Sequence, residues 1–592
     1  MSNNIQHLRQ LMHLHKIYAY LIPTADPHQS EYLADHWKAR EWISGFTGSA
    51  ATVVITQDHA GLWTDSRYFL QAEHQLESSE IVLHKQQANG TSEYITWLAE
   101  HLPKGSTVGL DGYLFSVGQL RQLEKELRLK GIAINSQVDL ISEVWSDRPA
   151  LPTHPIFEYD VAFAGESRAA KLNRIREKII KQGADFHLIT TLDDIAWTLN
   201  IRSKDVEFNP VTISYLVVNK EIAYLFINPK KVPDAIKQNL NNDGVILKPY
   251  ESLEDFLQIL EHPILVDDRL INIRLYNAIS ETQIIKGDNI PLHLKTIKNP
   301  TEIGNLREAM RKDGVALTRF FRWLEEKLQT RTVPEYEAGR KLNAFREAQG
   351  NYFGESFNAI VGYNSNSAIV HYRPEEATSS EIKPEGILLL DSGGQYLEGT
   401  TDITRTIALS APTDDQKRNY TLVLKGHITL AKAKFPVGTT GVQLDTLARQ
   451  FLWQQGLNFG HGTGHGVGFF LSVHEPPQGF TASPHNQRGT TPQELGMLTS
   501  NEPGFYKTGE YGIRIENLVL CVEAEETDFG KFLQFETLSL FPIDTSLIDS
   551  SLLTTEEKKW FNDYQRRVLN ELSPRLEGAE VEWLRRKCVQ VN

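Results

Sequence analysis

Cysteine is scarce in this chain, which has only Cys521 and Cys588 among 592 residues. Two thiols do not support a disulfide framework, and such scarcity is typical of proteins from a reducing compartment. The first sixteen residues lack the apolar core of a signal peptide, and no apolar run approaches the length of a membrane-spanning helix. We therefore expect a cytoplasmic protein without a membrane partner.

The chain also lacks a long block of charges of one sign. It has 61 basic and 75 acidic residues, for a net charge of −14, and the two kinds are interspersed. This distribution disfavours a nucleic-acid surface and indicates acidic faces that keep the protein in solution. The shares of hydrophobic residues (40%) and charged residues (23%) are ordinary for a globular protein.

The length is too great for a single hydrophobic core. A proline cluster at Pro149, Pro152 and Pro155 breaks regular structure, and a second break falls near residues 290–299. These breaks predict three domains, at residues 1–150, 151–296 and 297–592.

The first two domains are expected to be related α/β modules. Both mix strand-like runs with amphipathic helices, which are predicted at residues 118–128 and 166–182. The stretch 31–55 also parallels the stretch 192–218 in its order of apolar and aromatic residues. We interpret Trp37, Trp42 and Trp63 in the first module as core or interface aromatics.

The third domain is expected to be an internally duplicated α+β domain, because two helices precede a block of strands twice over. The tail, residues 556–587, is predicted to be helical and amphipathic. The other predicted helices are 301–328, 334–348, 413–434 and 441–455, and the predicted strands lie around 357–361, 386–391, 403–409 and 513–521.

Two aspartates in the third domain flank a turn-rich stretch. Asp391 ends the apolar run 387–390, Asp402 opens another apolar run, and glycines lie between them. This layout predicts a hairpin or ribbon that brings the two carboxylates side by side on neighbouring strands.

Three further residues have contexts that suit a metal ligand. His465 lies in the glycine-rich segment 460–466, Glu502 precedes Pro-Gly, and Glu516 alternates with Arg514. An unpaired buried carboxylate costs several kcal/mol, and a bound cation removes that cost. The alternative, a set of buried salt bridges, has only Arg405 and Arg514 as evident partners. Four carboxylates and one imidazole suit oxygen-preferring divalent ions, Mn²⁺ above all.

The order Asp391, Asp402, His465, Glu502, Glu516, with Gly-His-Gly-Thr-Gly-His-Gly at 460–466, resembles the pita-bread metallopeptidases. That family includes methionine aminopeptidases, prolidases and Xaa-Pro aminopeptidases, and the chain is most similar to the long, three-domain Xaa-Pro aminopeptidases. The resemblance extends to the segments 357–362, 371–372, 474–475 and 502–504. It implies two creatinase-like α/β modules, a pita-bread catalytic domain with a helical extension, and a homodimer.

The resemblance also implies a mechanism. Two divalent metal ions share a hydroxide that attacks the amino-terminal Xaa-Pro bond of peptides with proline in second position. In the implied mechanism, Asp402 and Glu516 contact both ions, Asp391 mainly one, and His465 with Glu502 the other. Further implied roles are proton transfer by Glu502, stabilisation of the tetrahedral intermediate by His474, substrate binding by His461 and His371, and orientation of a ligand by Arg514.

Three other functions stay open at this point. Prolidases share the five ligands but cleave dipeptides, and a catalytically inactive relative would use the fold to bind peptides. A metal-free, creatinase-like hydrolase is disfavoured because its chemistry does not need five intact ligands. Each of His371, His461 and His474 taken alone is more often a structural residue, and only the whole pattern favours function.

Overall fold

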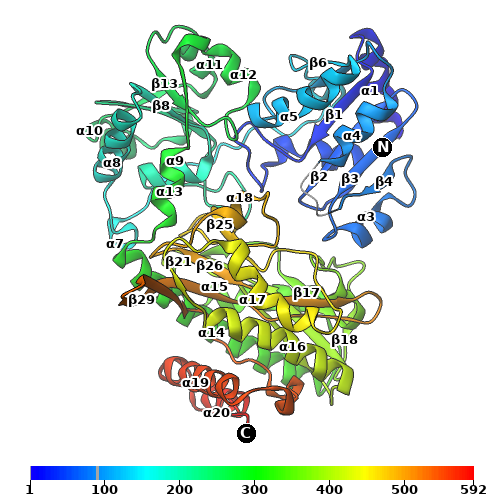
Figure 1. Ribbon diagram of the computed structural model, residues 1–592, viewed down its shortest axis with the longest axis vertical. Helices are drawn as coiled ribbons and strands as arrows, with labels where there is room; N and C mark the ends of the chain where they lie inside the picture. Colours follow the sequence, from blue (N-terminus) through cyan, green and yellow to red (C-terminus); the bar gives the residue numbers. More distant parts are fainter. Residues whose placement is uncertain (1, 88–91) are drawn as a thin grey trace. The chain divides into compact units, whose positions relative to one another are not determined.

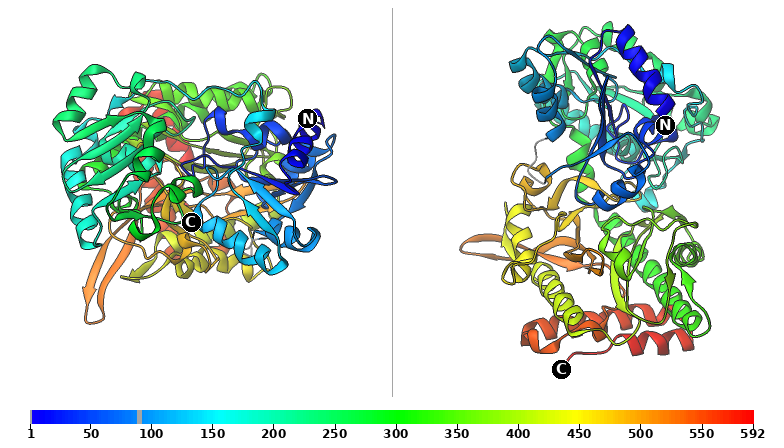
Figure 2. Two further views of the ribbon diagram at one scale, coloured as in Figure 1. Left: turned by 90° about the horizontal axis from the view of Figure 1, so that it is seen from above. Right: turned by 90° about the vertical axis from the view of Figure 1, so that its right-hand side faces the viewer.

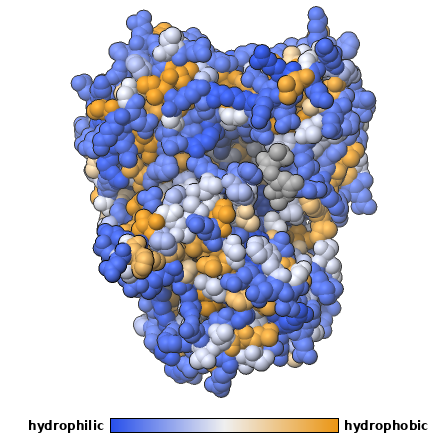
Figure 3. Space-filling model, in the orientation of Figure 1, coloured by the Kyte–Doolittle hydropathy of each residue, from blue (hydrophilic) through white to orange (hydrophobic). Residues whose placement is uncertain are grey.

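The computed structural model describes residues 2–87 and 92–592. The chain divides into two compact units, Met1–Lys295 and Thr296–Asn592, coloured blue to green and green to red in Figure 1. Within the described ranges, no helix is both long enough and apolar enough to cross a bilayer. The molecular face drawn in Figure 3 is largely hydrophilic.

The first unit contains a six-stranded sheet in the order β4-β3-β2-β1-β5-β6. β1 runs antiparallel to β2 and parallel to β5, and the pair β2/β3 is antiparallel while β3/β4 and β5/β6 are parallel. The strands are β1 (Ala19–Pro23), β2 (Ala51–Thr56), β3 (Ala60–Thr64), β4 (Val82–Lys85), β5 (Thr107–Leu110) and β6 (Ala133–Asn135). The helices are α1 (Ser2–Leu14), α2 (Ala39–Ser44), α3 (Phe69–Leu76), α4 (Glu93–His101), α5 (Val117–Leu127) and α6 (Ile141–Val144).

A second six-stranded sheet in the same unit, β12-β11-β10-β8-β13-β14, repeats this order and the same strand directions. The expectation of two related α/β modules is thereby confirmed. Its strands are β8 (Phe186–Ile189), β10 (Ser214–Asn219), β11 (Ala223–Ile227), β12 (Val245–Lys248), β13 (Ile264–Val266) and β14 (Ile284–Lys286), beside a small pair of β7 (Phe157–Glu158) and β9 (Ile201–Arg202). The helices are α7 (Val161–Ala164), α8 (Arg168–Lys181), α9 (Leu192–Leu199), α10 (Asp234–Asn242), α11 (Leu253–Gln258), α12 (Ile273–Ala278) and α13 (Ile290–Thr296).

The two helices predicted in this unit are present as α5 and α8. Each begins where a serine hydroxyl accepts a hydrogen bond from a backbone N–H, at Ser116 and Ser167. The apolar residues at helical spacing, such as Leu172, Ile175 and Ile179 in α8, are buried.

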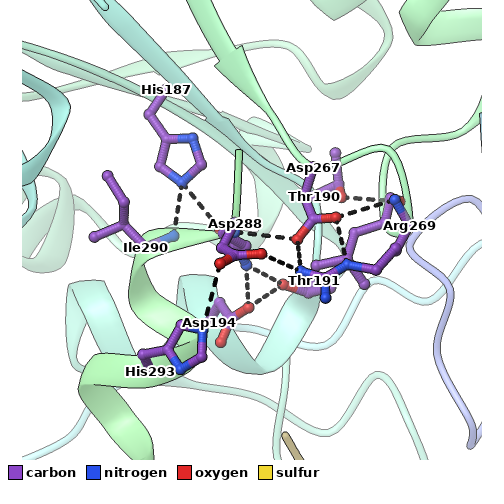
Figure 4. A network of polar contacts seen from close by, with 11 residues as sticks. His187, Thr190, Thr191, Asp194, Asp267, Arg269, Asp288, Ile290 and His293 are labelled. Carbon is purple, nitrogen blue, oxygen red and sulfur yellow. Dashed lines mark hydrogen bonds and ion pairs between the residues drawn. The ribbon is translucent and has the colours of Figure 1, made fainter. Parts of the chain in front are cut away.

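A buried polar network fixes the start of α13 on the second sheet (Figure 4). The backbone N–H of Ile290 donates to His187 Nε2 at 3.2 Å, and that of Asn289 donates to Asp267 at 3.1 Å. The Arg269 Nε atom donates to the same Asp267 carboxylate at 2.9 Å. Burial lowers the pKa of His187, so its neutral ring can accept this backbone hydrogen bond.

The second unit begins with the long helix α14 (Pro300–Leu328), which has Pro300 in its first turn and a capping box between Asn299 and Glu302. All four helices predicted before the tail are present, as α14, α15 (Glu335–Glu347), α16 (Asp414–Ala431) and α17 (Gly441–Trp453). α16 and α17 pack closely, because Gly426 has no side chain: a Cβ there would lie 2.1 Å from the Ala448 carbonyl oxygen.

The strands of this unit form several sheets. The five candidate ligands lie in or immediately beside strands of the sheet β17-β19-β22 and the sheet β23-β30-β29-β26-β24-β25. The hairpin β29–β30 projects from the unit (orange in Figure 2). Their bounds are β17 (Ile360–Tyr363), β19 (Ile387–Ser392), β22 (Ile403–Ala408), β23 (Lys434–Pro436), β24 (Gly464–Gly466), β25 (Glu475–Phe480), β26 (Leu498–Asn501), β29 (Asn517–Thr527) and β30 (Gly530–Thr537). Smaller elements are β15 (Val333–Pro334) with β18 (Glu381–Ile382), β16 (Tyr352–Glu355) with β20 (Gly394–Tyr396) and β21 (Gly399–Thr400), β27 (Gly504–Lys507) with β28 (Tyr511–Arg514), and the short helix α18 (Gln487–Thr490).

Three details of the sequence-based prediction are corrected. The strand expected at 357–361 begins later, at Ile360, where pairing with β19 starts. The strand expected at 513–521 is divided into β28 and β29, because the Glu516 backbone turns away to donate to the Thr404 carbonyl at 3.1 Å. The tail is two helices, α19 (Thr555–Leu572) and α20 (Gly578–Lys587), since Pro574 lacks the N–H that a continuous helix requires.

Candidate metal centre

Asp391 lies on one of two adjacent antiparallel strands and Asp402 immediately before the other, as the hairpin prediction required. Asp391 is in β19 opposite Thr404, and Asp402 immediately precedes β22. The chain between them is more than a turn, because β20 and β21 pair with each other and β20 pairs with β16. The register of β19 and β22 therefore decides the spacing of the two carboxylates.

His465 lies in β24, where glycines permit very close strand packing. A Cβ at Gly464 would lie 1.9 Å from the Ser500 carbonyl oxygen, and one at Gly466 would lie 2.3 Å from that of Glu475. His465 Nδ1 donates to the Gly466 carbonyl at 2.9 Å, which makes Nε2 the nitrogen that carries the lone pair a cation would bind. Nε2 lies 3.5 Å from Asp402 Oδ2 and 3.5 Å from Glu502 Oε1.

Glu516 completes a three-residue group with Asp402 and His465. One ligand atom from each of these buried side chains lies within 4.8 Å of the others. Glu516 Oε2 also accepts a hydrogen bond from the Thr404 hydroxyl at 2.7 Å. Distances of this size let the three side chains contact one ion after small adjustments.

Arg514 holds the remaining aspartate. Its guanidinium donates to Asp391 Oδ2 at 2.6 Å, to the Thr404 hydroxyl at 3.2 Å and to the Tyr506 hydroxyl at 2.7 Å. Tyr506 in turn bonds His461 Nε2 at 2.8 Å. One buried arginine thus links a candidate ligand to a candidate substrate-binding histidine.

The group holds four carboxylates against this single guanidinium. Burial, and next the charges of Asp391 and Glu502, raise the pKa of Asp402 well above its usual range. Burial and the neighbouring carboxylates do the same to the pKa of Glu516. Burial also raises the pKa of Glu502 to about 7, although Arg514 opposes the shift.

Bound cations would reverse these shifts, since positive charge favours ionised carboxylates. Asp391 Oδ1 is buried and has no hydrogen-bond partner in the described part of the chain. The unpartnered Asp391 oxygen, the surplus negative charge and the His465 imidazole together fit a site for divalent metal.

The other predicted histidines differ in their relation to this centre. The His474 ring stands edge-on to that of His465, with the centroids 4.3 Å apart. His461 reaches the centre through Tyr506. His371 follows the short helix Asn364–Ala368 and is half-buried.

Three contributing residues were missed by the sequence reasoning: Thr404, Ser500 and Tyr506. Thr404 lies two residues after Asp402, and Ser500 lies two before Glu502, so strand alternation could have indicated both. The Ser500 hydroxyl donates to Glu502 Oε1 at 3.3 Å and accepts from the His465 backbone N–H at 2.9 Å. Only the fold identifies Tyr506.

Arg405 supports the centre from behind. Its guanidinium donates to the Glu516 carbonyl oxygen at 2.6 Å, the Asn517 side-chain oxygen at 2.8 Å and the Tyr564 hydroxyl of α19 at 2.8 Å. It therefore anchors α19 to the backbone of a candidate ligand.

Comparison with known proteins identifies the family. A model of metallopeptidase family M24 matches residues 304–523, and a model of its carboxy-terminal region matches residues 531–591. Two models of the creatinase/prolidase amino-terminal domain match residues 4–143 and 147–302. A Laccaria bicolor protein named "Probable Xaa-Pro aminopeptidase P" is 40% identical over 99% of this chain and 93% of its own length. The chain belongs to metallopeptidase family M24.

Two other relatives support this family assignment. "Xaa-Pro aminopeptidase 1" of Dictyostelium discoideum is 39% identical over 99% of this chain and 96% of its own length. A crystal structure from Caenorhabditis elegans is described as an X-prolyl aminopeptidase, a cytosolic enzyme with a di-nuclear active site. It is 36% identical in sequence and superposes with a TM-score of 0.95, over 100% of this chain and 99% of its own. The M24 chain is therefore a metallopeptidase, and its predicted fold of two creatinase-like modules and a pita-bread catalytic domain is confirmed.

Proposed function

We propose that this M24 chain is an Xaa-Pro aminopeptidase, which removes the first residue of peptides that carry proline in second position. The observation that carries the proposal is the set of five donor residues in one largely buried, strongly acidic centre. The chain is similar over its full length to proteins named for this activity, which supports peptides with proline in second position as the substrate class.

Two divalent metal ions are proposed as cofactors, with Mn²⁺ as the preferred ion because oxygen donors predominate. The proposed ligands are Asp391, Asp402, His465, Glu502 and Glu516. When bound, the ions would polarise the scissile carbonyl and lower the pKa of the attacking water.

Glu502 is the proposed proton carrier. It is the most exposed of the four carboxylates, so it can meet both the water and the leaving group. A carboxylate at this position can accept a proton from the water and return it to the leaving group. The Ser500 hydroxyl holds one of its oxygens in place.

The histidines are proposed to act on the substrate. His474, beside His465, would stabilise the developing negative charge on the carbonyl oxygen. His461, fixed by Tyr506, and His371 would hold the peptide on either side of the scissile bond. Arg514 is a positioning residue, because it contacts Asp391 rather than substrate.

The specificity follows from the chemistry of proline. The bond before proline is a tertiary amide without an N–H, and the ring restricts φ. A peptidase that relies on that N–H handles the bond poorly, whereas one that anchors the terminal amine and accepts the ring can select it.

The test compares Arg-Pro-Pro with Gly-Pro after metal has been removed and Mn²⁺ restored. We expect fast Mn²⁺-dependent release of arginine from the tripeptide and little cleavage of the dipeptide. Glu502→Gln should lower kcat/KM by roughly 10²–10⁴-fold, while Glu510→Gln, at an exposed position nearby, should leave it unchanged. Preference for Gly-Pro would indicate a prolidase, and no hydrolysis of either peptide would indicate a peptide-binding protein.

We further propose domain limits at 1–150, 151–296 and 297–592, a homodimer and a cytoplasmic location. The family-model matches at 4–143, 147–302 and 304–523 support the limits. Light scattering on the purified chain tests the dimer, because a mass equal to one chain would contradict it.

A further inference from the structure

A pair of histidines in the first unit has no role in the centre described above. His59 immediately precedes β3, and His84 lies in the neighbouring edge strand β4. Their Nε2 atoms are 3.2 Å apart. Both rings are half-buried, so solvent reaches them.

The sheet builds this pair through its register. β3 and β4 are parallel, with Trp63 opposite His84. His59, Gly61 and Trp63 alternate along one face. A Cβ at Gly61 would lie 2.7 Å from His59 Nε2 and 2.5 Å from the Trp63 ring, so only glycine leaves room for both side chains.

Two tryptophans fix the orientation of the imidazoles. The His84 ring stacks on Trp63 with centroids 3.9 Å apart and an interplanar angle of 6°. The His59 ring stacks on Trp97 of α4 at 4.7 Å. His101 also stacks on Trp97, at 4.5 Å, but forms no part of the close pair. Rings held in this way lose little further freedom on binding a ligand.

The 3.2 Å distance between His59 Nε2 and His84 Nε2 matches the distance between two nitrogen ligands of one metal ion. With metal–nitrogen bonds of about 2.0–2.1 Å, neighbouring ligands of a tetrahedral ion lie about 3.3 Å apart. Metal binding also requires neutral rings with a free lone pair. Burial and then the charges of His59 and His101 lower the pKa of His84 to about 4. Burial likewise lowers the pKa of His59, although Asp58 opposes it.

We propose that His59 and His84 bind one late first-row transition-metal ion, such as Zn²⁺, Ni²⁺ or Cu²⁺, with water at its remaining positions. Imidazole donors select these ions, in contrast to the oxygen-rich centre of the second unit. The bound ion links the edge strand β4 to β3 and stabilises this end of the sheet against local opening.

The first experiment counts ions. The Mn²⁺-loaded full chain is dialysed against Zn²⁺, and bound zinc is measured for the original chain and for His59→Gln, His84→Gln and the control His101→Gln. We expect the original chain and His101→Gln to hold one more Zn²⁺ per chain than either pair variant. Equal zinc in all four proteins, or a loss in only one pair variant, would overturn the proposal and leave an ordinary hydrogen bond between the rings.

Thermal unfolding provides the second measurement. In EDTA, His84→Gln should unfold within a few degrees of the original chain, which shows that the variant is folded. Zn²⁺ should raise the unfolding temperature more for the original chain than for His84→Gln, and an equal rise in both would count against the site. These outcomes depend on residues 59–101 and are independent of peptidase activity, whose ligands lie between residues 391 and 516.

Discussion

At the residue scale, the candidate centre depends on Arg514, which bonds one carboxylate oxygen of Asp391 and leaves the other available to a metal ion. Arg514 bonds Asp391 Oδ2, while Oδ1 stays without a hydrogen-bond partner among the described residues. The guanidinium also donates to Thr404 and Tyr506, so three hydrogen bonds fix its position. Because Arg514 in turn holds Oδ2 of Asp391, it also sets the orientation of Oδ1.

Arg514→Lys tests this positioning role, since lysine keeps the charge but cannot make all three contacts. We expect the affinity for Mn²⁺ to fall roughly 10–100-fold, measured by calorimetric titration of the metal-free protein. The matched control, Arg319→Lys, alters a partly exposed pair with Glu580 and should leave the affinity unchanged. Equal affinity in Arg514→Lys and the original chain would contradict the role.

The raised carboxyl pKa values predict that the stabilisation of the folded protein by bound Mn²⁺ depends on pH. In the metal-free protein, the pKa of Glu502 is raised from 4.5 to about 7, and those of Asp402 and Glu516 are also raised. The folded state therefore holds protons that the unfolded state releases. For Glu502, the stability from the protonated group is complete below about pH 4.5 and is lost as pH rises through about 7.

Mn²⁺ compensates for this loss by favouring the ionised carboxylates. We expect saturating Mn²⁺ to raise the unfolding temperature more at pH 7.5 than at pH 5.5, in thermal scans of one preparation with and without EDTA. A rise that is equal at both values, or larger at pH 5.5, would show that these carboxyls do not bind the ion.

At the element scale, the strand β24 matters as much as the histidine that it carries. Gly464 lets the backbone of β26, and Gly466 that of β25, approach within a distance that no other residue would permit. His465 is thereby held beside Ser500 and Glu502, from which it is separated by more than thirty residues of sequence.

Gly464→Ala is expected to destabilise the protein by about 1–3 kcal/mol through overpacking and to weaken Mn²⁺ binding, because His465 must move. Gly304→Ala is the matched control, since a Cβ at this exposed position of α14 meets nothing within 4 Å. It should stabilise the helix by up to about 1 kcal/mol. Denaturant unfolding and metal titration measure both effects, and similar results for the two variants would refute the packing argument.

At the scale of the whole molecule, function is divided between two compact units. All five proposed catalytic ligands belong to Thr296–Asn592, and both members of the proposed histidine pair belong to Met1–Lys295. A ligand that binds only one unit raises the free energy of unfolding of that unit and does not directly change that of the other.

We expect Mn²⁺ to raise the unfolding transition of the second unit and to leave that of the first nearly unchanged. At a concentration 100 times the Kd, the gain is about 2.7 kcal/mol per bound ion. Calorimetry of the full chain with Mn²⁺ or EDTA measures this, with the transitions assigned by limited proteolysis. A single transition that shifts as a whole would show that the units unfold together.

The sequence by itself determined the class of chemistry and most of the elements. Apolar periodicity located α14 to α17, and the chemistry of Asp391, Asp402, His465, Glu502 and Glu516 indicated a divalent metal. These are local signals, because they depend on residue type and on neighbours within a few positions.

Only the tertiary structure decided which side chains meet. Arg514 reaches Asp391 across 123 residues, and Tyr506 reaches His461 across 45. His59 and His84 approach because of a strand register that no pattern specifies. Such contacts depend on packing between distant segments, which also divided the strand expected at 513–521 at Glu516, where the backbone bonds Thr404 instead of extending the sheet.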